Sequence, residues 1–340
     1  MTRGLVLGKF APLHRGHQLL IETALAAVDE LVILIYEAAD VTDVPLATRA
    51  GWLRRLFPTA RVIEAVGGPT VAGRDPAVMR AQEDYIRRAV PSPVTHFFSS
   101  EWYGEHVSAA LGATNVVVDL ERRRVPISGS EVRADPFGHR AFLEAFVYRD
   151  LVKKIVFLGA ESTGKTALAA RMAGAFGTRV MPEYGRDFWE RHHAPDGTLT
   201  PEDLVALARG HIEREEALIP ESNRFLFVDT NALTTAMYAL HYHGRLLPEL
   251  ADLARQAETR YATTFVCADD LPYVEDGTRL GEGHRAAFQR RILDDLYRRG
   301  VAYSVVAGSI ERRVEAAGRQ LLGGGAGHAG PGGPGGPGSG

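Results

Sequence analysis

The clearest chemical motif of the chain lies at residues 159–166, which read Gly-Ala-Glu-Ser-Thr-Gly-Lys-Thr. An apolar run, Ile155 to Leu158, precedes this segment, and a helix-like stretch follows it. The pattern predicts a phosphate-binding loop whose backbone N–H groups point at phosphate oxygens, with a positive charge from Lys165 and a Mg²⁺ ligand from Thr166. The residues expected at ATP here are Gly159, Glu161, Ser162, Thr163, Gly164, Lys165 and Thr166. The alternative is a glycine-rich turn without a ligand, but four lysines in the whole chain make a chance match rare.

A second set of polar residues begins at Gly8, directly after the first apolar run of the chain. The segment from Gly8 to His17 reads GKFAPLHRGH and leads into a predicted helix. Helix N-termini favour anions, and imidazoles placed there can donate hydrogen bonds to a reacting α-phosphate. His14 and His17 are therefore candidate catalytic residues. A metal-binding pair or ordinary helix-capping histidines would show the same spacing.

A third motif, Ile127 to Arg133, reads ISGSEVR. It predicts a helix start that presents hydroxyl groups and backbone amides, with the fork of Arg133 one turn further in. Taken alone, the heptapeptide is also explained by an ordinary N-cap followed by a solvent-exposed arginine. Together with the two histidines it predicts a site that holds a triphosphate from both sides.

The elements that position these motifs alternate between short apolar runs and helical periods, which predicts parallel α/β sheets. Such sheets bind ligands at the carboxyl ends of their strands. The expected strands are 4–7, 31–36, 61–65, 95–98 and 115–119 in the first half, and 155–158, 225–229, 264–267 and 303–306 in the second. The helices expected in the first half are 17–28, 47–56, 76–89 and 102–111.

Length and composition fit two α/β domains in a globular chain of 340 residues, of which 45% are hydrophobic. We expect domains at 1–140 and 153–322, a hinge at 141–152, and a disordered glycine- and proline-rich tail at 323–340. A formal net charge of −3 gives no sign of nucleic-acid binding. The single cysteine, Cys267, fits a reducing cytoplasm, and no apolar run is long enough for membrane insertion.

The segments Lys9–His17 and Ile127–Arg133 together resemble the His-x-Gly-His nucleotidylyltransferase superfamily. Joined to the phosphate-binding loop, they resemble the NadR-type bifunctional family over roughly residues 3–320. In that family a Rossmann-like nicotinamide-mononucleotide adenylyltransferase domain precedes a P-loop ribosylnicotinamide kinase domain. The first predicted strand starts within five residues of Met1, so the N-terminal helix-turn-helix domain of repressor relatives is not expected.

For the first half, the resemblance implies that ATP phosphates contact His14 and His17 with help from Lys9, Ser128 and Arg133. The phosphate of nicotinamide mononucleotide then attacks the α-phosphorus of ATP, and pyrophosphate leaves. Trp52 is the candidate for stacking on the nicotinamide ring, although a core position would also explain it. The ATP-binding set is completed by Gly8, Phe10, Gly129 and Ser130.

For the second half, the resemblance and the apolar strand before Asp229 imply a Mg²⁺-binding acid at that position. Glu183 is expected to accept the proton of the riboside 5′-hydroxyl, with Arg186 beside it, although a surface helix start would look similar. The segment from Pro272 to Arg279 resembles a substrate-binding segment of these kinases. It supplies Tyr273 and Asp276 as riboside candidates and Arg279 as an ATP contact on a mobile lid or, alternatively, as a plain loop residue.

The resemblance thus implies a cytoplasmic enzyme that uses ATP and Mg²⁺ to convert nicotinamide riboside into nicotinamide mononucleotide and then into NAD. It leaves room for a homo-oligomer. Two alternatives keep both folds: other substrates in either half, or a nucleotide-sensing module without turnover. Zinc is not expected at His192–His193 or at His241 and His243, because no further ligand accompanies either group.

Overall fold

The computed structural model describes residues 1–69, 73–91, 93–192, 198–273 and 282–323. Its contacts divide the chain into two units, 1–151 and 152–340. Asp276, Arg279 and all but the first residue of the expected tail lie outside the described residues.

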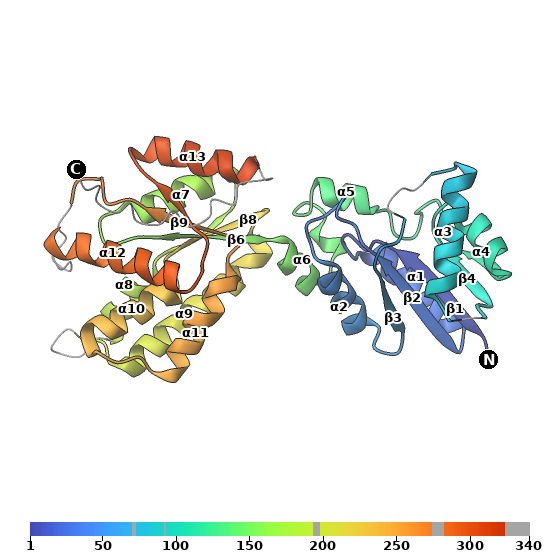
Figure 1. The fold of residues 1–340 in the computed structure, drawn as a ribbon, viewed down its shortest axis with the longest axis horizontal. Coiled ribbons are helices and arrows are strands. Elements are labelled where there is room, and N and C mark those ends of the chain that lie inside the picture. The colour runs from blue at the N-terminus through green and yellow to red at the C-terminus, as the bar shows by residue number, and fades with distance from the viewer. Residues whose placement is uncertain (70–72, 92, 193–197, 274–281, 324–340) are drawn as a thin grey trace, which may run out of the picture. The chain divides into compact units, whose positions relative to one another are not determined.

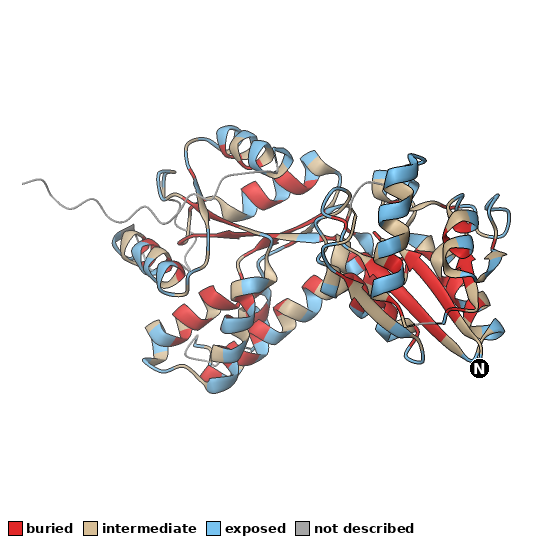
Figure 2. Ribbon diagram, turned by 45° about the vertical axis from the view of Figure 1, so that its right-hand side comes forward, coloured by how far each residue is buried: buried red, intermediate tan, exposed pale blue. Residues whose placement is uncertain are grey.

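The first unit is built on a five-stranded parallel sheet with the strand order β3-β2-β1-β4-β5, which confirms the predicted Rossmann-like fold (Figure 1). The strands buried at its centre read as continuous apolar runs because helices cover both faces (Figure 2). The helices α3 and α4 pack on one face, and α1 and α2 contact the strands from the other. The elements are β1 (Arg3–Gly8), α1 (Arg15–Ala27), β2 (Glu30–Tyr36), α2 (Leu46–Leu56), β3 (Arg61–Ala65), α3 (Pro76–Ala89), β4 (His96–Ser99), α4 (Gly104–Leu111), β5 (Thr114–Val117), α5 (Gly129–Ala134), η1 (Arg140–Phe142) and α6 (Ala145–Leu151).

The segment 141–152, expected as a hinge, is mostly helical, and nearly all of it belongs to the first unit. Two side-chain contacts tie this segment to earlier helices. Arg15 forms an ion pair with Glu144 at 2.7 Å, and the indole nitrogen of Trp52 donates to Asp150 at 2.8 Å. The change between units therefore falls at residues 151 and 152, directly before the next strand.

The second unit carries another five-stranded parallel sheet, with the strand order β10-β9-β6-β8-β7. The helices α7 and α13 pack together on one face, while α9 contacts strands from the other (Figure 1). This arrangement confirms the predicted P-loop kinase-like sheet. The elements are β6 (Lys153–Leu158), α7 (Lys165–Phe176), β7 (Arg179–Met181), α8 (Tyr184–His192), α9 (Pro201–Leu218), η2 (Ile219–Glu221), β8 (Phe225–Asp229), α10 (Ala232–His243), α11 (Pro248–Arg260), β9 (Thr263–Cys267), α12 (Glu282–Arg298), β10 (Ser304–Val306) and α13 (Ile310–Leu322).

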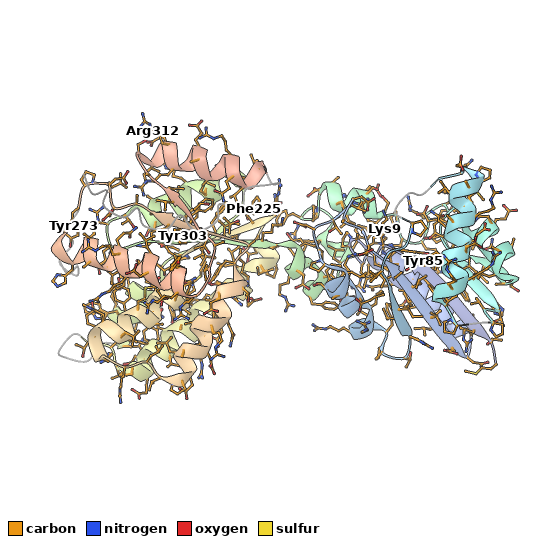
Figure 3. The ribbon with its side chains drawn as sticks, in the orientation of Figure 1. Lys9, Tyr85, Phe225, Tyr273, Tyr303 and Arg312 are labelled. Carbon is orange, nitrogen blue, oxygen red and sulfur yellow. The ribbon has the colours of Figure 1, made fainter. Side chains whose placement is uncertain are left out.

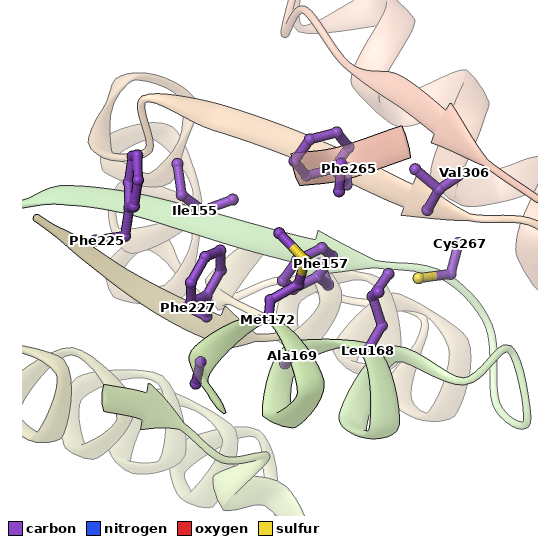
Figure 4. Packing of buried hydrophobic residues seen from close by; sticks show 12 residues of the cluster. Ile155, Phe157, Leu168, Ala169, Met172, Phe225, Phe227, Phe265, Cys267 and Val306 are labelled. Atoms are coloured by element: carbon purple, nitrogen blue, oxygen red, sulfur yellow. The ribbon is translucent and has the colours of Figure 1, made fainter. Parts of the chain in front are cut away.

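The core of the second unit fixes the position of the phosphate-binding loop. Phe157, Phe227 and Phe265, from three neighbouring strands, are fully buried against Leu168 and Met172 of α7 (Figure 4). Each such side chain stabilises the fold by about 1.5–3 kcal/mol on burial. The loop is therefore held between a buried strand and a buried helix. None of the described helices is long and apolar enough to span a bilayer.

Candidate nucleotide sites

The two histidines of the first unit form the start of α1. His14 is the N-cap residue, and its Nδ1 accepts from the backbone N–H of Gly16 at 3.1 Å. In return, the Nδ1 of His17 accepts from the backbone N–H of His14 at 3.4 Å. The two rings stack with their centroids 3.8 Å apart. This is a capping box made from two imidazoles, which satisfies helix N–H groups that would otherwise lack partners.

These hydrogen bonds determine what the imidazoles can do. A neutral imidazole that accepts through Nδ1 carries its proton on Nε2, so both rings present an Nε2–H donor. Burial, reinforced by Arg122 and Arg133, lowers the pKa of His14 to about 4. Burial and the neighbouring His14 hold the pKa of His17 well below its usual value. At neutral pH the pair is thus two preorganised, uncharged donors, which suits a phosphate oxygen on which charge develops.

The ISGSEVR motif lies beside this pair, as its sequence predicted. A Cβ on Gly129 would lie 3.8 Å from Nε2 of His14 and 3.1 Å from Nη1 of Arg133. Arg133 donates to the carbonyl of Ala11 at 2.7 Å and to Oγ of Ser130 at 3.0 Å, so it joins α5 to the loop before α1. The start of α5 and the start of α1 therefore face one cavity.

Ser128 has a more local role than expected. Its hydroxyl donates to the carboxylate of Glu131 at 2.6 Å and accepts from the backbone N–H of the same residue at 3.2 Å. The side chain is occupied in capping α5, so the expectation that it contacts ATP directly is not supported.

The cavity of the first unit brings the histidines together with residues from the loops after β4 and β5. Arg122 lies in this cavity and donates to Glu101 at 3.1 Å. Arg122 belongs to the run Glu121–Arg124, whose sequence fits either phosphate binding or a surface segment, and only the fold brings it to the histidines. The lining comprises His14, Gly16, His17, Ser100, Glu101, Val118, Asp119, Arg122, Val125, Ile127 and Gly129.

The residues of the loop after β1 were expected to contact ATP, but their side chains support the site through packing and an ion pair. Lys9 forms an ion pair with Asp40 at 2.8 Å, so its ammonium is directed to that carboxylate and not to the histidines. Phe10 is 1% exposed and meets the ring of His17 edge-on, so it packs beneath the site and is not free to contact ATP. A Cβ on Gly8 would lie 3.0 Å from the Phe10 ring, so Gly8 leaves room for this packing.

Arg49 is a supporting residue that the sequence did not reveal. It is 1% exposed and donates to the backbone carbonyls of Lys9, Tyr36 and Val44. These contacts hold the loop after β1 in place. No local pattern distinguishes such an arginine from the surface arginines of the same helix, since its partners come from distant segments.

The expectation for Trp52 is wrong. Its ring is 3% exposed, and its nitrogen is already bonded to Asp150, so the indole is a core residue that no nicotinamide ring can reach. Trp102 is a better candidate. It is 43% exposed and directly follows Ser100 and Glu101 of the cavity lining. The guanidinium of Arg74 already lies over its ring, 5.2 Å from the centroid.

In the second unit the phosphate-binding loop has the curvature that its glycines predict. Gly159 and Gly164 have positive φ angles of 148° and 80°. A Cβ on Gly159 would come within 2.7 Å of the Thr163 hydroxyl, so the tight approach requires glycine. Lys165 and Thr163 both donate to the carbonyl of Ala160, at 2.8 Å and 2.7 Å. The loop is formed, and Lys165 lies folded across it.

Asp229 and Thr166 meet next to this loop, as predicted. The Thr166 hydroxyl donates to Oδ2 of Asp229 at 2.5 Å. Oδ1 of Asp229 is buried and has no hydrogen-bond partner among the described residues. Burial raises the pKa of Asp229, and the positive charge of Lys165 offsets this only in part. A buried carboxylate oxygen beside a hydroxyl fits Mg²⁺, so these two residues would hold the ion.

Acidic and aromatic groups surround the same site. The Tyr238 hydroxyl donates to Glu161 at 3.4 Å, and the ring stacks on Phe288 with centroids 4.7 Å apart. Burial, and then the charges of Glu161 and Glu183, raise the pKa of Tyr238. Glu183 therefore lies close enough to act electrostatically on this site. Tyr238 and Glu161 had not been expected at a riboside.

Two further residues expected at the riboside, Arg186 and Tyr273, are located only by their place in the chain. Arg186 lies in the first turn of α8, and Tyr273 is the last described residue before the gap at 274–281. Asp276 and Arg279 fall within that gap.

Comparisons with known proteins agree with this two-unit arrangement. A family model described as an AAA domain matches residues 154–313. The chain is 29% identical over 320 residues to the trifunctional NAD biosynthesis/regulator protein NadR of Salmonella typhimurium, covering 88% of this chain and 77% of the relative. The corresponding protein of Escherichia coli is 28% identical over 322 residues, covering 89% of this chain and 78% of the relative.

Two solved structures share the fold. One is a NadR protein in complex with NAD and AMP-PNP, with 22% identity and a TM-score of 0.58. The other is a NadR protein in complex with NR, with 24% identity and a TM-score of 0.59. Each comparison covers 97% of this chain and 98% of the solved chain. The similarity to NadR proteins thus runs through both units of the chain.

Proposed function

We propose that the chain is a bifunctional enzyme of NAD synthesis that phosphorylates nicotinamide riboside in its second unit and adenylylates the product in its first. One observation carries the proposal. A paired-imidazole site and a P-loop with a metal-site acid occur in one chain, in the order that the resemblance to the NadR-type family implies.

In the kinase step the 5′-hydroxyl oxygen of the riboside bonds to the γ-phosphorus of ATP, and the bond from that phosphorus to the β–γ bridging oxygen breaks. Glu183 accepts the hydroxyl proton, while Lys165 leaves the Ala160 carbonyl to bind phosphate oxygens. Asp229 and Thr166 would hold Mg²⁺, which would neutralise charge on the phosphates. The ring of Tyr238 and the carboxylate of Glu161 suit the cationic pyridinium of nicotinamide riboside.

In the adenylyl-transfer step a phosphate oxygen of nicotinamide mononucleotide bonds to the α-phosphorus of ATP, and pyrophosphate leaves. The Nε2–H groups of His14 and His17 donate to the oxygens on which charge increases, and Arg122 and Arg133 supply fixed positive charge. No side chain has to transfer a proton, so catalysis consists of positioning and charge stabilisation.

The proposal is tested with purified protein, MgATP and a panel of substrates. Nicotinamide riboside should yield ADP and nicotinamide mononucleotide and then NAD with pyrophosphate, and omission of Mg²⁺ should stop the first step. Pyrimidine and purine nucleosides serve as kinase controls. Turnover of one of these in preference to nicotinamide riboside, or nucleotide binding without any product, would refute the assignment.

A further inference from the structure

Arg313 is a fully buried arginine of α13 that contacts the phosphate-binding loop directly. Its Nη1 donates to the backbone carbonyl of Thr163 at 2.7 Å, inside the loop. Its Nε donates to the carbonyl of Gly308 at 2.8 Å, and its Nη2 donates to the carbonyl of Ala268 at 3.2 Å and to Asp270. Four of the five N–H groups of the guanidinium thus have partners.

The partners of Arg313 come from three separate loops. Thr163 lies in the loop after β6, Ala268 and Asp270 follow β9, and Gly308 follows β10. Since β6, β9 and β10 are adjacent and parallel, all three loops leave the same edge of the sheet. That edge is where α/β sheets bind nucleotides. One planar side chain therefore fixes the phosphate-binding loop relative to the two loops that border it.

Gln289 of α12 makes a second link of the same kind at the start of the loop. Its Oε1 accepts from the backbone N–H of Ala160 at 2.8 Å, and its Nε2 donates to the carbonyl of Cys267 at 2.9 Å. The phosphate-binding loop is thus joined through Gln289 to the last residue of β9 and through Arg313 to the residues that follow β9. Its backbone N–H groups can bind a phosphate only if this curvature is maintained.

We propose that Arg313 is a positioning residue for phosphoryl transfer, which holds the phosphate-binding loop in the geometry that receives the ATP phosphates. The proposal rests on the kinase function assigned to the second unit. The side chain does not touch substrate; it acts through the Thr163 carbonyl. Lysine cannot replace it, because a single ammonium cannot reach acceptors in three loops as the planar guanidinium does.

The test compares Arg313→Lys with Arg312→Lys in the full-length chain. Arg312 is the matched control, because it is exposed and projects outward from the same helix (Figure 3). Riboside phosphorylation is measured against MgATP and, separately, against nicotinamide riboside. Arg313→Lys should raise KM for ATP or lower kcat by about tenfold to a hundredfold, the effect of misplacing a binding group by up to ~1 Å. KM for the riboside and adenylyl transfer by the first unit should not change.

A second variant, Asp270→Asn, weakens the hold on Arg313 without removing the arginine, and it should shift the same parameters by about twofold to fivefold. It keeps the test decisive if Arg313→Lys does not fold. Normal kinetics for ATP in a folded Arg313→Lys variant, or in Asp270→Asn when Arg313→Lys is unfolded, would overturn the proposal. So would an equal rise in KM for both substrates.

If the wild-type protein does not phosphorylate the riboside, the assigned function fails, but the role of Arg313 can still be tested. Binding of a hydrolysis-resistant ATP analogue with Mg²⁺ is then titrated, and the part lost in Lys165→Ala is assigned to the second unit. Arg313→Lys should lower the affinity of the second unit for the ATP analogue about tenfold. Unchanged affinity would contradict the positioning role.

Discussion

At the scale of single residues, the two nitrogens of His14 have different tasks. Nδ1 accepts the Gly16 N–H and caps α1, while Nε2–H faces the cavity. Asparagine can replace the first function but not the second, since its side-chain oxygen is a good N-cap acceptor and its amide is too short to reach the Nε2 position.

His14→Asn should therefore keep the stability of the first unit within about 0.5 kcal/mol, whereas His14→Ala should lose about 1 kcal/mol. Both variants should lose adenylyl transfer by about a hundredfold to a thousandfold, because a preorganised donor to the transition state is missing. Urea unfolding and NAD formation from nicotinamide mononucleotide check the two effects. Normal turnover by His14→Asn would exclude Nε2 from catalysis.

The lowered pKa of His14 predicts a pH dependence of stability. The folded-state pKa of about 4 lies below the usual 6.5, so the unfolded chain binds the proton more tightly between these values. Stability should therefore be complete above pH 6.5 and fall by up to about 3 kcal/mol as pH decreases towards 4.

This dependence is measured by urea unfolding of the first unit at several pH values, with His139→Asn as a control for a partly exposed histidine. His14→Asn should make the profile shallower, with the remaining slope due to His17, and His139→Asn should leave it intact. A wild-type profile that rises towards pH 5 would show that His14 is charged in the folded state.

At the scale of elements, the sequence was most informative where strands are long and buried on both faces. The central strands were predicted from continuous apolar runs, and the structure confirms the two parallel sheets. β7 was missed because its three residues include an arginine and show no period. An edge strand this short is defined by pairing with β8, which is a tertiary property.

The site residues likewise divide into those that lie in local sequence motifs and those whose role depends on tertiary packing. His14, His17, Thr166 and Asp229 lie in local motifs, and the structure brings each pair together as expected. Arg49, Arg122 and Arg313 could not be predicted, because their partners are set by the packing of distant loops. Trp52 was misassigned since the pattern of α2 does not show whether its tryptophan faces the core or a ligand.

Substitutions of Trp102 and Trp52 test which of the two tryptophans contacts the nicotinamide ring. Trp102→Ala should raise KM for nicotinamide mononucleotide about tenfold, because the exposed ring already accepts the cation of Arg74 and can accept a pyridinium instead. Trp52→Phe should leave that KM unchanged and lower stability through loss of the bond to Asp150. The measurement is adenylyl-transfer kinetics at varied mononucleotide, with urea unfolding alongside. A raised KM in Trp52→Phe with an unchanged KM in Trp102→Ala would instead place the nicotinamide contact on α2.

At the scale of the whole molecule, we propose that each unit carries out one reaction. Each unit has its own parallel sheet, its own buried core and its own phosphate-binding helix start. Since each unit has its own phosphate-binding site, a substitution that abolishes one reaction should not impair the other. The only required link is chemical, since the product of the kinase step is the substrate of adenylyl transfer.

The most direct test of this central claim is to follow products from nicotinamide riboside and MgATP with His17→Ala, Lys165→Ala and an equal mixture of the two. His17→Ala should accumulate nicotinamide mononucleotide without NAD, and Lys165→Ala should form NAD only when the mononucleotide is supplied. The mixture should restore NAD formation from the riboside. Loss of both reactions in either folded single variant, or a mixture that forms no NAD, would contradict two independent sites.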